Sequence, residues 1–196
     1  IDGVLAEWQT LLGDPQLHQD HFVSVLGDLK GFLSTSDQKV EVWLGWNQTT
    51  NLLYVAARVT DDAFGIRSDE SNAQLAWRGD NMQVFIDADK SGGTYSETNL
   101  QAQHFAMSAS GVRGPTLLPN GIENPGGVKC VMVSSGNVYS YEWAIPAWKI
   151  FTPPNSATNH ALKSNSTIGL SFAFGDAETQ SAADLGNFHA LNALFG

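Results

Sequence analysis

The sequence predicts an all-β fold, an antiparallel two-sheet β-sandwich with a few short helical turns. At least seven segments have the sequence character of strands, and several of them alternate apolar and polar residues with a period of two, as strands with one buried face do. Stretches rich in Gly, Asn, Ser and Pro separate these segments, and such residues favour turns. No βαβ alternation is visible, and this number of strands at these spacings is typical of a sandwich.

The expected strands follow one another along most of the chain. They are Val40–Trp46, Leu52–Thr60, Asn81–Asp87, Gln103–Ser108, Gly127–Ser134, Asn137–Ile145 and Thr167–Phe174. Ser135-Gly136 between two of them indicates a hairpin connection. We expect short helical turns at Pro146–Phe151 and near Ala183–Leu194.

The composition limits the classes of partner. The 196 residues suit one domain, residues 1–196, and 10 Lys and Arg against 20 Asp and Glu give a net charge of −10. A negative field repels phosphate backbones and anionic lipid, so nucleic acid and membrane surfaces are excluded as expected partners. Neutral sugars and divalent cations remain compatible. The single cysteine, Cys130, cannot form an intramolecular disulfide and is expected to be a small buried hydrophobic residue.

Five motifs occur in a fixed order along the chain. They are Ile1-Asp2-Gly3 with Glu7-Trp8, Leu53-Tyr54-Val55-Ala56 leading to Val59-Thr60-Asp61-Asp62, the segment from Trp77 to Asp87, Tyr141-Glu142-Trp143-Ala144-Ile145-Pro146, and Ile168-Gly169 through Asp176. Together they resemble the family 9 carbohydrate-binding modules, which accompany xylanases and other secreted glycosidases. The resemblance implies a jelly-roll-like sandwich, bound structural calcium and no catalytic activity. It also implies a secreted, monomeric module that targets an attached glycoside hydrolase to polysaccharide or oligosaccharide.

The resemblance points to a sugar site around Trp77, whose position in the family stacks on the sugar. An indole face suits the apolar face of a sugar ring. Gln83 takes the position of a family Glu that hydrogen-bonds the sugar, and His104 lies on a ligand-contacting strand. The family's second Trp is missing, so Phe188 or His189 is the expected substitute. The alternatives are a core Trp, a strand-surface His without a role, and a domain that has lost its sugar clamp.

The segment Asp87-Ala88-Asp89-Lys90-Ser91-Gly92-Gly93 is the candidate calcium loop, with Asp87, Asp89 and Ser91 as ligands. Oxygen ligands on alternate residues followed by Gly suit a hard cation. The alternative is a polar hairpin turn, in which Asp and Gly are equally common. Further acidic residues within the matched motifs are Asp61, Asp62, Asp80 and Asp176.

Two other functions compete with sugar binding. A structural or interaction domain would keep the sandwich without the sugar site. A haem-binding electron-transfer domain would use His104 and Met107, but three residues apart on a strand these side chains point to opposite faces. Catalysis is not indicated, because no G-x-S-x-G, H-E-x-x-H or phosphate-binding Gly loop is present.

Overall fold

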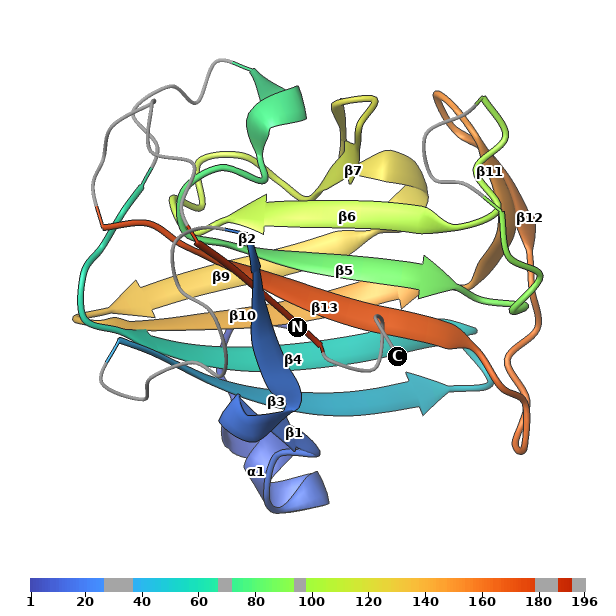
Figure 1. Cartoon of the computed structure of the whole chain (residues 1–196). Coiled ribbons are helices and arrows are strands. Elements are labelled where there is room, and N and C mark those ends of the chain that lie inside the picture. Colours follow the sequence, from blue (N-terminus) through green and yellow to red (C-terminus); the bar gives the residue numbers. More distant parts are fainter. Residues whose placement is uncertain (27–36, 67–71, 94–97, 179–186, 192–196) are drawn as a thin grey trace.

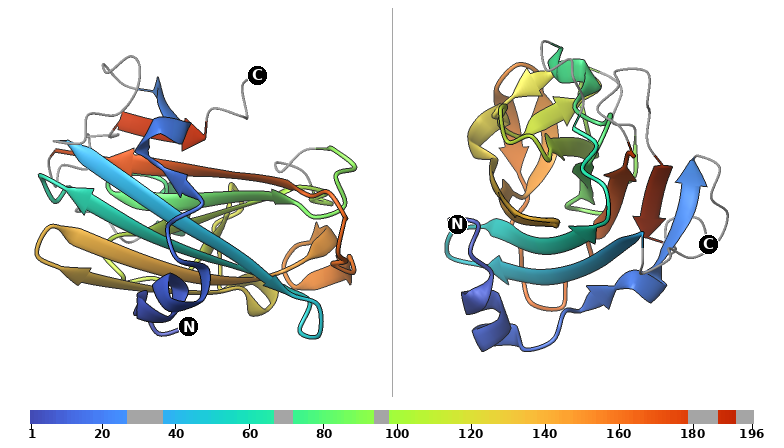
Figure 2. Two further views of the ribbon diagram at one scale, coloured as in Figure 1. Left: turned by 90° about the horizontal axis from the view of Figure 1, so that it is seen from below. Right: turned by 90° about the vertical axis from the view of Figure 1, so that its left-hand side faces the viewer.

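The computed structural model describes residues 1–26, 37–66, 72–93, 98–178 and 187–191. Two antiparallel sheets lie face to face as the layers of a sandwich (Figures 1 and 2). The five-stranded sheet has the order β1-β3-β4-β10-β9, and the seven-stranded sheet has the order β2-β14-β13-β5-β6-β7-β8. The strands β11 and β12 form a separate two-stranded sheet, called the ribbon below.

The five-stranded sheet contains β1 (Leu17–His18), β3 (Gln38–Asn47), β4 (Leu52–Asp61), β10 (Val138–Pro146) and β9 (Lys129–Ser135). The seven-stranded sheet contains β2 (Phe22–Leu26), β14 (Asn187–Leu191), β13 (Gly169–Asp176), β5 (Asn81–Asp87), β6 (Gln103–Ser108), β7 (Thr116–Leu118) and β8 (Ile122–Glu123). The ribbon consists of β11 (Trp148–Thr152) and β12 (Ser156–Asn159). Short 3-10 turns are η1 (Gln19–His21), η2 (Ala73–Leu75) and η3 (Pro125–Gly127).

The core lies between the sheets and follows the period-two pattern. On β4, Val55 and Val59 point inward, and on β5 Val84 does so from the opposite layer. Aromatic side chains, among them fully buried Trp143, fill the middle. Because alternate residues of β5 are used in the core, the residues between them are left for the outer face of the seven-stranded sheet.

The helix α1 (Ala6–Leu12) covers the outer face of the five-stranded sheet (Figure 1). A second, smaller cluster forms there, in which Leu5 and Trp8 pack on Trp43 and Ala56. Among the residues with a described position, no helix is long and apolar enough to cross a membrane.

All seven expected strands are confirmed, with ends that differ by a few residues at most. The predicted helical turn at Pro146–Phe151 is wrong, because this segment enters β11, where Trp148 and Phe151 stack with ring centroids 4.6 Å apart. The second predicted turn, near Ala183–Leu194, contains strand β14, and the rest of that range lies outside the described residues. The helix α1 was not predicted from the sequence.

Candidate functional site

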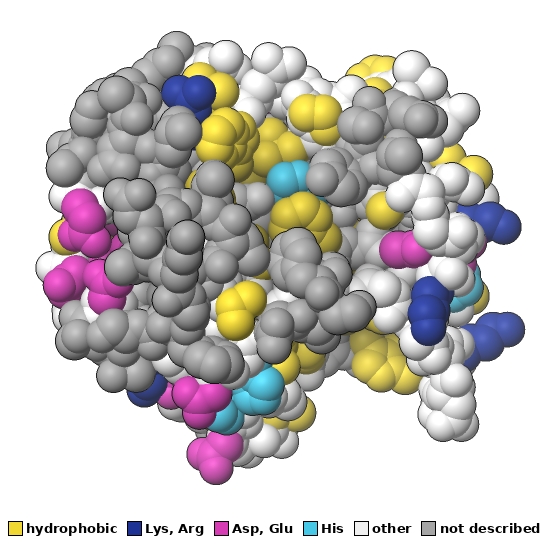
Figure 3. Space-filling view, viewed as in Figure 1, with side chains coloured by type: hydrophobic (Ala, Val, Ile, Leu, Met, Phe, Trp, Pro, Cys, Tyr) yellow, Lys and Arg dark blue, Asp and Glu magenta, His cyan; other side chains and the backbone are white. Residues whose placement is uncertain are grey.

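A groove of about 730 Å³ lies on the outer face of the seven-stranded sheet. Outward-pointing residues of β5, β6, β13 and β14 form its floor, and Trp77, Leu118 and Pro119 border it. Figure 3 shows this face, where a histidine lies among hydrophobic side chains over β5 and β6. We call this feature the outer groove. Its size is that of pockets that hold small organic ligands.

Trp77 stands at the border of the outer groove, in the turn between η2 and β5. The indole is half-buried and packs on Ala106 and Leu118 of the sheet surface. The guanidinium of Arg78 lies over its ring, 5.2 Å from the centroid, in the geometry of a cation–π contact. Phe188 of β14 approaches from the groove floor. Trp77 is therefore held in place by several neighbours, not projected freely into solvent.

The predicted opposing wall of the sugar site takes a different position. Phe188 also lines the outer groove, but its ring centroid is only 5.9 Å from that of Trp77, at an interplanar angle of 43°. A sugar ring between two aromatic faces needs two contact distances of about 4 Å each. The two rings therefore contact one another directly, and Phe188, 6% exposed, supports Trp77 from below.

Gln83 and His104 meet on the floor of the outer groove. The Nε2 atom of His104 lies 2.7 Å from Oε1 of Gln83. The imidazole stacks on the ring of Phe85, with centroids 4.0 Å apart and an interplanar angle of 18°. Burial lowers the pKa of His104 to about 4, so the side chain is neutral at pH 7.

Phe85 is a groove residue that the sequence interpretation missed. It follows Gln83 by two positions on β5, so period-two alternation places both side chains on the same face. Since Gln83 was already a candidate, that spacing was the signal that could have identified Phe85.

His189 lies on the opposite side of β14 from Phe188, because successive strand residues point to opposite faces. It is fully buried between the sheets, and its Nδ1 lies 3.3 Å from Oε1 of Gln38. Burial lowers the pKa of His189 to about 4. His189 is therefore no wall of the outer groove. Met107 likewise points into the core while His104 faces outward, which does not suit a haem held between the two.

The predicted calcium loop after β5 forms a hydrogen-bonded turn. The carboxylate of Asp87 accepts the backbone N–H groups of Ser91 (3.3 Å) and Gly92 (2.8 Å), and Asp89 accepts that of Ser91 (3.2 Å). Lys149 lies 3.8 Å from Asp89, and the Ser91 hydrogen bonds hold the pKa of that carboxyl below its usual range. These contacts match the polar-turn alternative and give no support for calcium at this loop.

A different acidic cluster suits a cation better. Carboxylate oxygens of Asp61, Asp80 and Asp176 lie within 4.8 Å of one another, and all three residues are buried. They come from the end of β4, the turn before β5 and the end of β13, so the cluster joins the two sheets.

Only part of this cluster is satisfied by the protein. Asp80 accepts hydrogen bonds from Gly65 N, Ala177 N and the hydroxyl of Tyr139. Both oxygens of Asp176 lack a hydrogen-bond partner among the described residues. Burial and the neighbouring carboxylates raise the pKa of Asp61 to about 7 and that of Asp176 to about 8. Buried, unpaired carboxylate oxygens are costly, and a hard cation such as Ca²⁺ would satisfy them.

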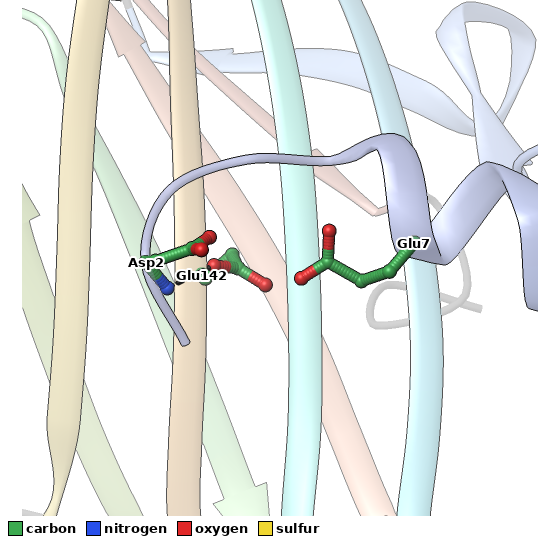
Figure 4. A group of neighbouring side chains, drawn as sticks. All are labelled: Asp2, Glu7 and Glu142. Atoms are coloured by element: carbon green, nitrogen blue, oxygen red, sulfur yellow. Dashed lines mark hydrogen bonds between the residues drawn. The ribbon is translucent and has the colours of Figure 1, made fainter.

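A third acidic group, Asp2, Glu7 and Glu142, lies on the outer face of the five-stranded sheet (Figure 4). Here Glu142 already accepts three hydrogen bonds. One of its oxygens accepts the N–H groups of Asp2 and Gly3, both at 2.6 Å, and the other accepts the indole N–H of Trp8 at 2.6 Å. These hydrogen bonds of Glu142 hold the N-terminal segment on the sheet, and the other two carboxylates of the group are exposed, so this group suits a cation less well than the buried cluster of Asp61, Asp80 and Asp176.

Comparison with known proteins agrees with the fold. The profile of the family described as carbohydrate family 9 binding domain-like matches residues 23–191. The structure is similar to that of a family 9 carbohydrate-binding module from Caldicellulosiruptor kristjanssonii, solved in complex with cellotriose. The TM-score is 0.64 and the identity 14%, over 97% of this chain and 78% of that one. A search of curated protein sequences found no match. Since the family profile spans most of the sequence, the chain belongs to the carbohydrate family 9 binding domain-like family, whose members are non-catalytic binding modules.

Proposed function

We propose that the outer groove is the sugar-binding site of this module. The observation that carries the proposal is the meeting of Trp77, Gln83 and His104 along one groove, although they come from a turn and two strands. The indole supplies an apolar surface for the C–H face of a sugar ring. The amide and the imidazole supply hydrogen-bonding groups for its hydroxyls.

The ligand proposed for the outer groove is a neutral oligosaccharide or polysaccharide. No Lys or Arg occurs among the described residues that line the groove, and His104 is uncharged at pH 7. Asp87, at one end of the groove, would repel an anionic sugar, as would the net charge of −10. Because the structural relative was solved with cellotriose, soluble β-glucan oligosaccharides are the first ligands to test.

We place the module outside the cell, as a monomeric domain attached to a glycoside hydrolase. A groove with one aromatic platform is expected to bind weakly. Attachment to a catalytic domain compensates for weak binding, because it raises the effective concentration of the enzyme near its polysaccharide.

We propose that the cluster of Asp61, Asp80 and Asp176 holds the structural calcium ion of the module. All three carboxylates would be ligands, and Asp176 would gain its missing partner. The ion would neutralise buried negative charge and link β4 to β13 across the sandwich, so its role is stability, not chemistry.

The test is a glycan array in calcium-containing buffer, followed by calorimetric titration, with wild type, Trp77→Ala and Trp46→Ala. Trp46 is an exposed indole on β3 that does not line the outer groove, so it is the matched control. Loss of an aromatic anchor costs at least about 2 kcal/mol of binding free energy. We expect Trp77→Ala to lose binding and Trp46→Ala to retain it. If wild type binds no glycan, the missing clamp favours a structural or interaction domain instead.

A further inference from the structure

Asn81, the first residue of β5, links the turn that carries Trp77 to the floor of the outer groove. It is buried, with 2% of its surface exposed. Its Nδ2 donates to the carbonyl oxygens of Trp77 (2.8 Å) and Gly79 (2.6 Å). Its Oδ1 accepts a hydrogen bond from Nε2 of Gln83 (2.9 Å). One amide therefore connects the backbone of Trp77 with the side chain of Gln83.

The backbone carbonyl groups of Trp77 and Gly79 determine which atom donates and which accepts in each of these hydrogen bonds. Carbonyl oxygens only accept, so the group of Asn81 that faces them must be its NH₂. Its oxygen then faces Gln83, which must donate through Nε2. The oxygen of Gln83 is thereby directed to His104, whose Nε2 must carry the proton that it donates. The network therefore assigns one imidazole tautomer to His104 and one orientation to each amide.

The space around Asn81 supports the same arrangement. Gly175 lies opposite Asn81 in the register of β13 and β5. A Cβ atom on residue 175 would overlap the Nδ2 of Asn81 and the carbonyl oxygen of Gly79. The neighbouring strand thus leaves room for this amide only because residue 175 has no side chain.

We propose that Asn81 is a positioning residue for ligand binding, which holds Trp77 and Gln83 in one fixed relation so that both act on the same sugar unit. This inference rests on the proposed function of the outer groove. Neither Asn81 nor Gly175 lines the groove, so their action on a ligand passes through Trp77 and Gln83.

The test compares Asn81→Asp with Asn155→Asp. The carboxylate has the shape of the amide but no N–H donors, so it would face the carbonyl oxygens of Trp77 and Gly79 with repulsion. Asn155 is exposed in a turn, and its substitution changes the net charge by the same amount. Asn81→Ala, which removes the amide without burying a charge, keeps the test available if the Asp variant fails to fold.

Two measurements are made on each variant. The first is the sugar affinity, which we expect to fall about tenfold for the Asn81 variants and to stay unchanged for Asn155→Asp. The second is the set of indole N–H signals in the NMR spectrum. The chain has 6 Trp, and the signal missing from Trp77→Phe identifies that of Trp77. We expect the Asn81 variants to shift or broaden this signal while the others stay in place.

A Trp77 signal unmoved by both Asn81 substitutions, or sugar affinity within twofold of wild type, would overturn the positioning role. So would a general change of all indole signals in both Asn81 variants, since Asn81 would then support the whole fold and not the position of Trp77 in particular. If wild type binds no sugar, the proposed function fails, yet the NMR comparison still decides whether Asn81 positions Trp77.

Discussion

The rings of Trp77 and Phe188 contact one another, with centroids 5.9 Å apart, so no sugar ring fits between them. An aromatic residue at position 188 therefore does not replace a second wall. The platform for a ligand is one-sided, and Phe188 contributes by supporting the indole from the groove floor. This arrangement differs from the opposing wall that the sequence analysis expected Phe188 or His189 to form in place of the family's second Trp.

The substitution Phe188→Trp tests whether Phe188 supports the Trp77 indole or forms a second wall of the sugar site. A second wall would bind sugar more tightly when enlarged, whereas a buried support has no room for a larger ring. We expect sugar affinity no higher than that of wild type. We also expect a free energy of unfolding lower by about 1–3 kcal/mol, the usual cost of overpacking. Calorimetric titration and urea denaturation measure the two effects. A clear gain in sugar affinity would show that residue 188 contacts the sugar as a second aromatic wall.

Calcium should stabilise the wild-type chain through the cluster of Asp61, Asp80 and Asp176. At a concentration 100 times the dissociation constant, a ligand of the folded state adds about 2.7 kcal/mol to the free energy of unfolding. For a chain of this length, that is a rise in Tm of about 5–10 °C. Differential scanning fluorimetry with calcium or with a chelator measures the change.

Asp176→Asn and Asp89→Asn distinguish the two acidic sites. Asp176→Asn should abolish the response to calcium. In chelator it should be at least as stable as wild type, because it removes a buried carboxylate that has no hydrogen-bond partner among the described residues. Asp89→Asn in the turn after β5 should respond as wild type does. The opposite pattern would place the ion at the turn.

The sequence predicts those features of the site that depend on one strand, and it does not predict those that depend on how distant strands pair. Alternation along β5 places Gln83 on the face opposite Val84, and it would place Phe85 beside Gln83 in the same way, because each is a property of one strand. The choice between Phe188 and His189 needs the register of β14 against β13, which fixes the face that each residue occupies. No local pattern contains that register.

The acidic cluster shows the same limit more clearly. Asp61, Asp80 and Asp176 each belong to a motif that the sequence displays, but they converge only when β4 and β13 belong to different sheets that face one another. The loop of Asp87 and Asp89 has a calcium-like spacing within one segment. In the structure, those carboxylates accept backbone N–H groups of the same turn, so local spacing alone does not distinguish a calcium loop from a polar turn.

The stability of the chain should depend on pH through His104. Burial lowers the pKa of His104 from 6.5 to about 4, so between these values the unfolded chain binds a proton that the folded chain does not. The free energy of unfolding should therefore fall as the pH drops from about 6.5 to about 4, by at most about 3 kcal/mol from this residue. Asp87 is the other titratable side chain among the described residues that line the groove.

His104→Gln removes the contribution of His104 and keeps a donor for Gln83. Buried His189, whose pKa is also lowered to about 4, contributes in the same way to both proteins and cancels in the difference. Urea denaturation at pH 7, 5.5 and 4.5 should give a smaller loss of stability for the variant than for wild type. The pKa values of Asp61 and Asp176 are raised, so these residues act in the opposite direction, but they do so in both proteins and cancel in the difference. The exposed His18→Gln is the control. Parallel profiles for wild type and His104→Gln would contradict the prediction.

Glu142 should matter for stability and not for sugar binding. Its buried carboxylate accepts three N–H groups, from Asp2, Gly3 and Trp8, on the sheet face remote from the outer groove. In Glu142→Gln, an NH₂ group would face at least one of these donors, at a cost of about 3 kcal/mol. Thermal melting should show a clear fall in Tm, while Glu7→Gln, an exposed carboxylate of the same cluster, should melt as wild type does. Because α1 and the outer groove lie on different sheets, sugar affinity measured below the transition should be unchanged; a parallel loss of affinity would show that the two faces are coupled through the core.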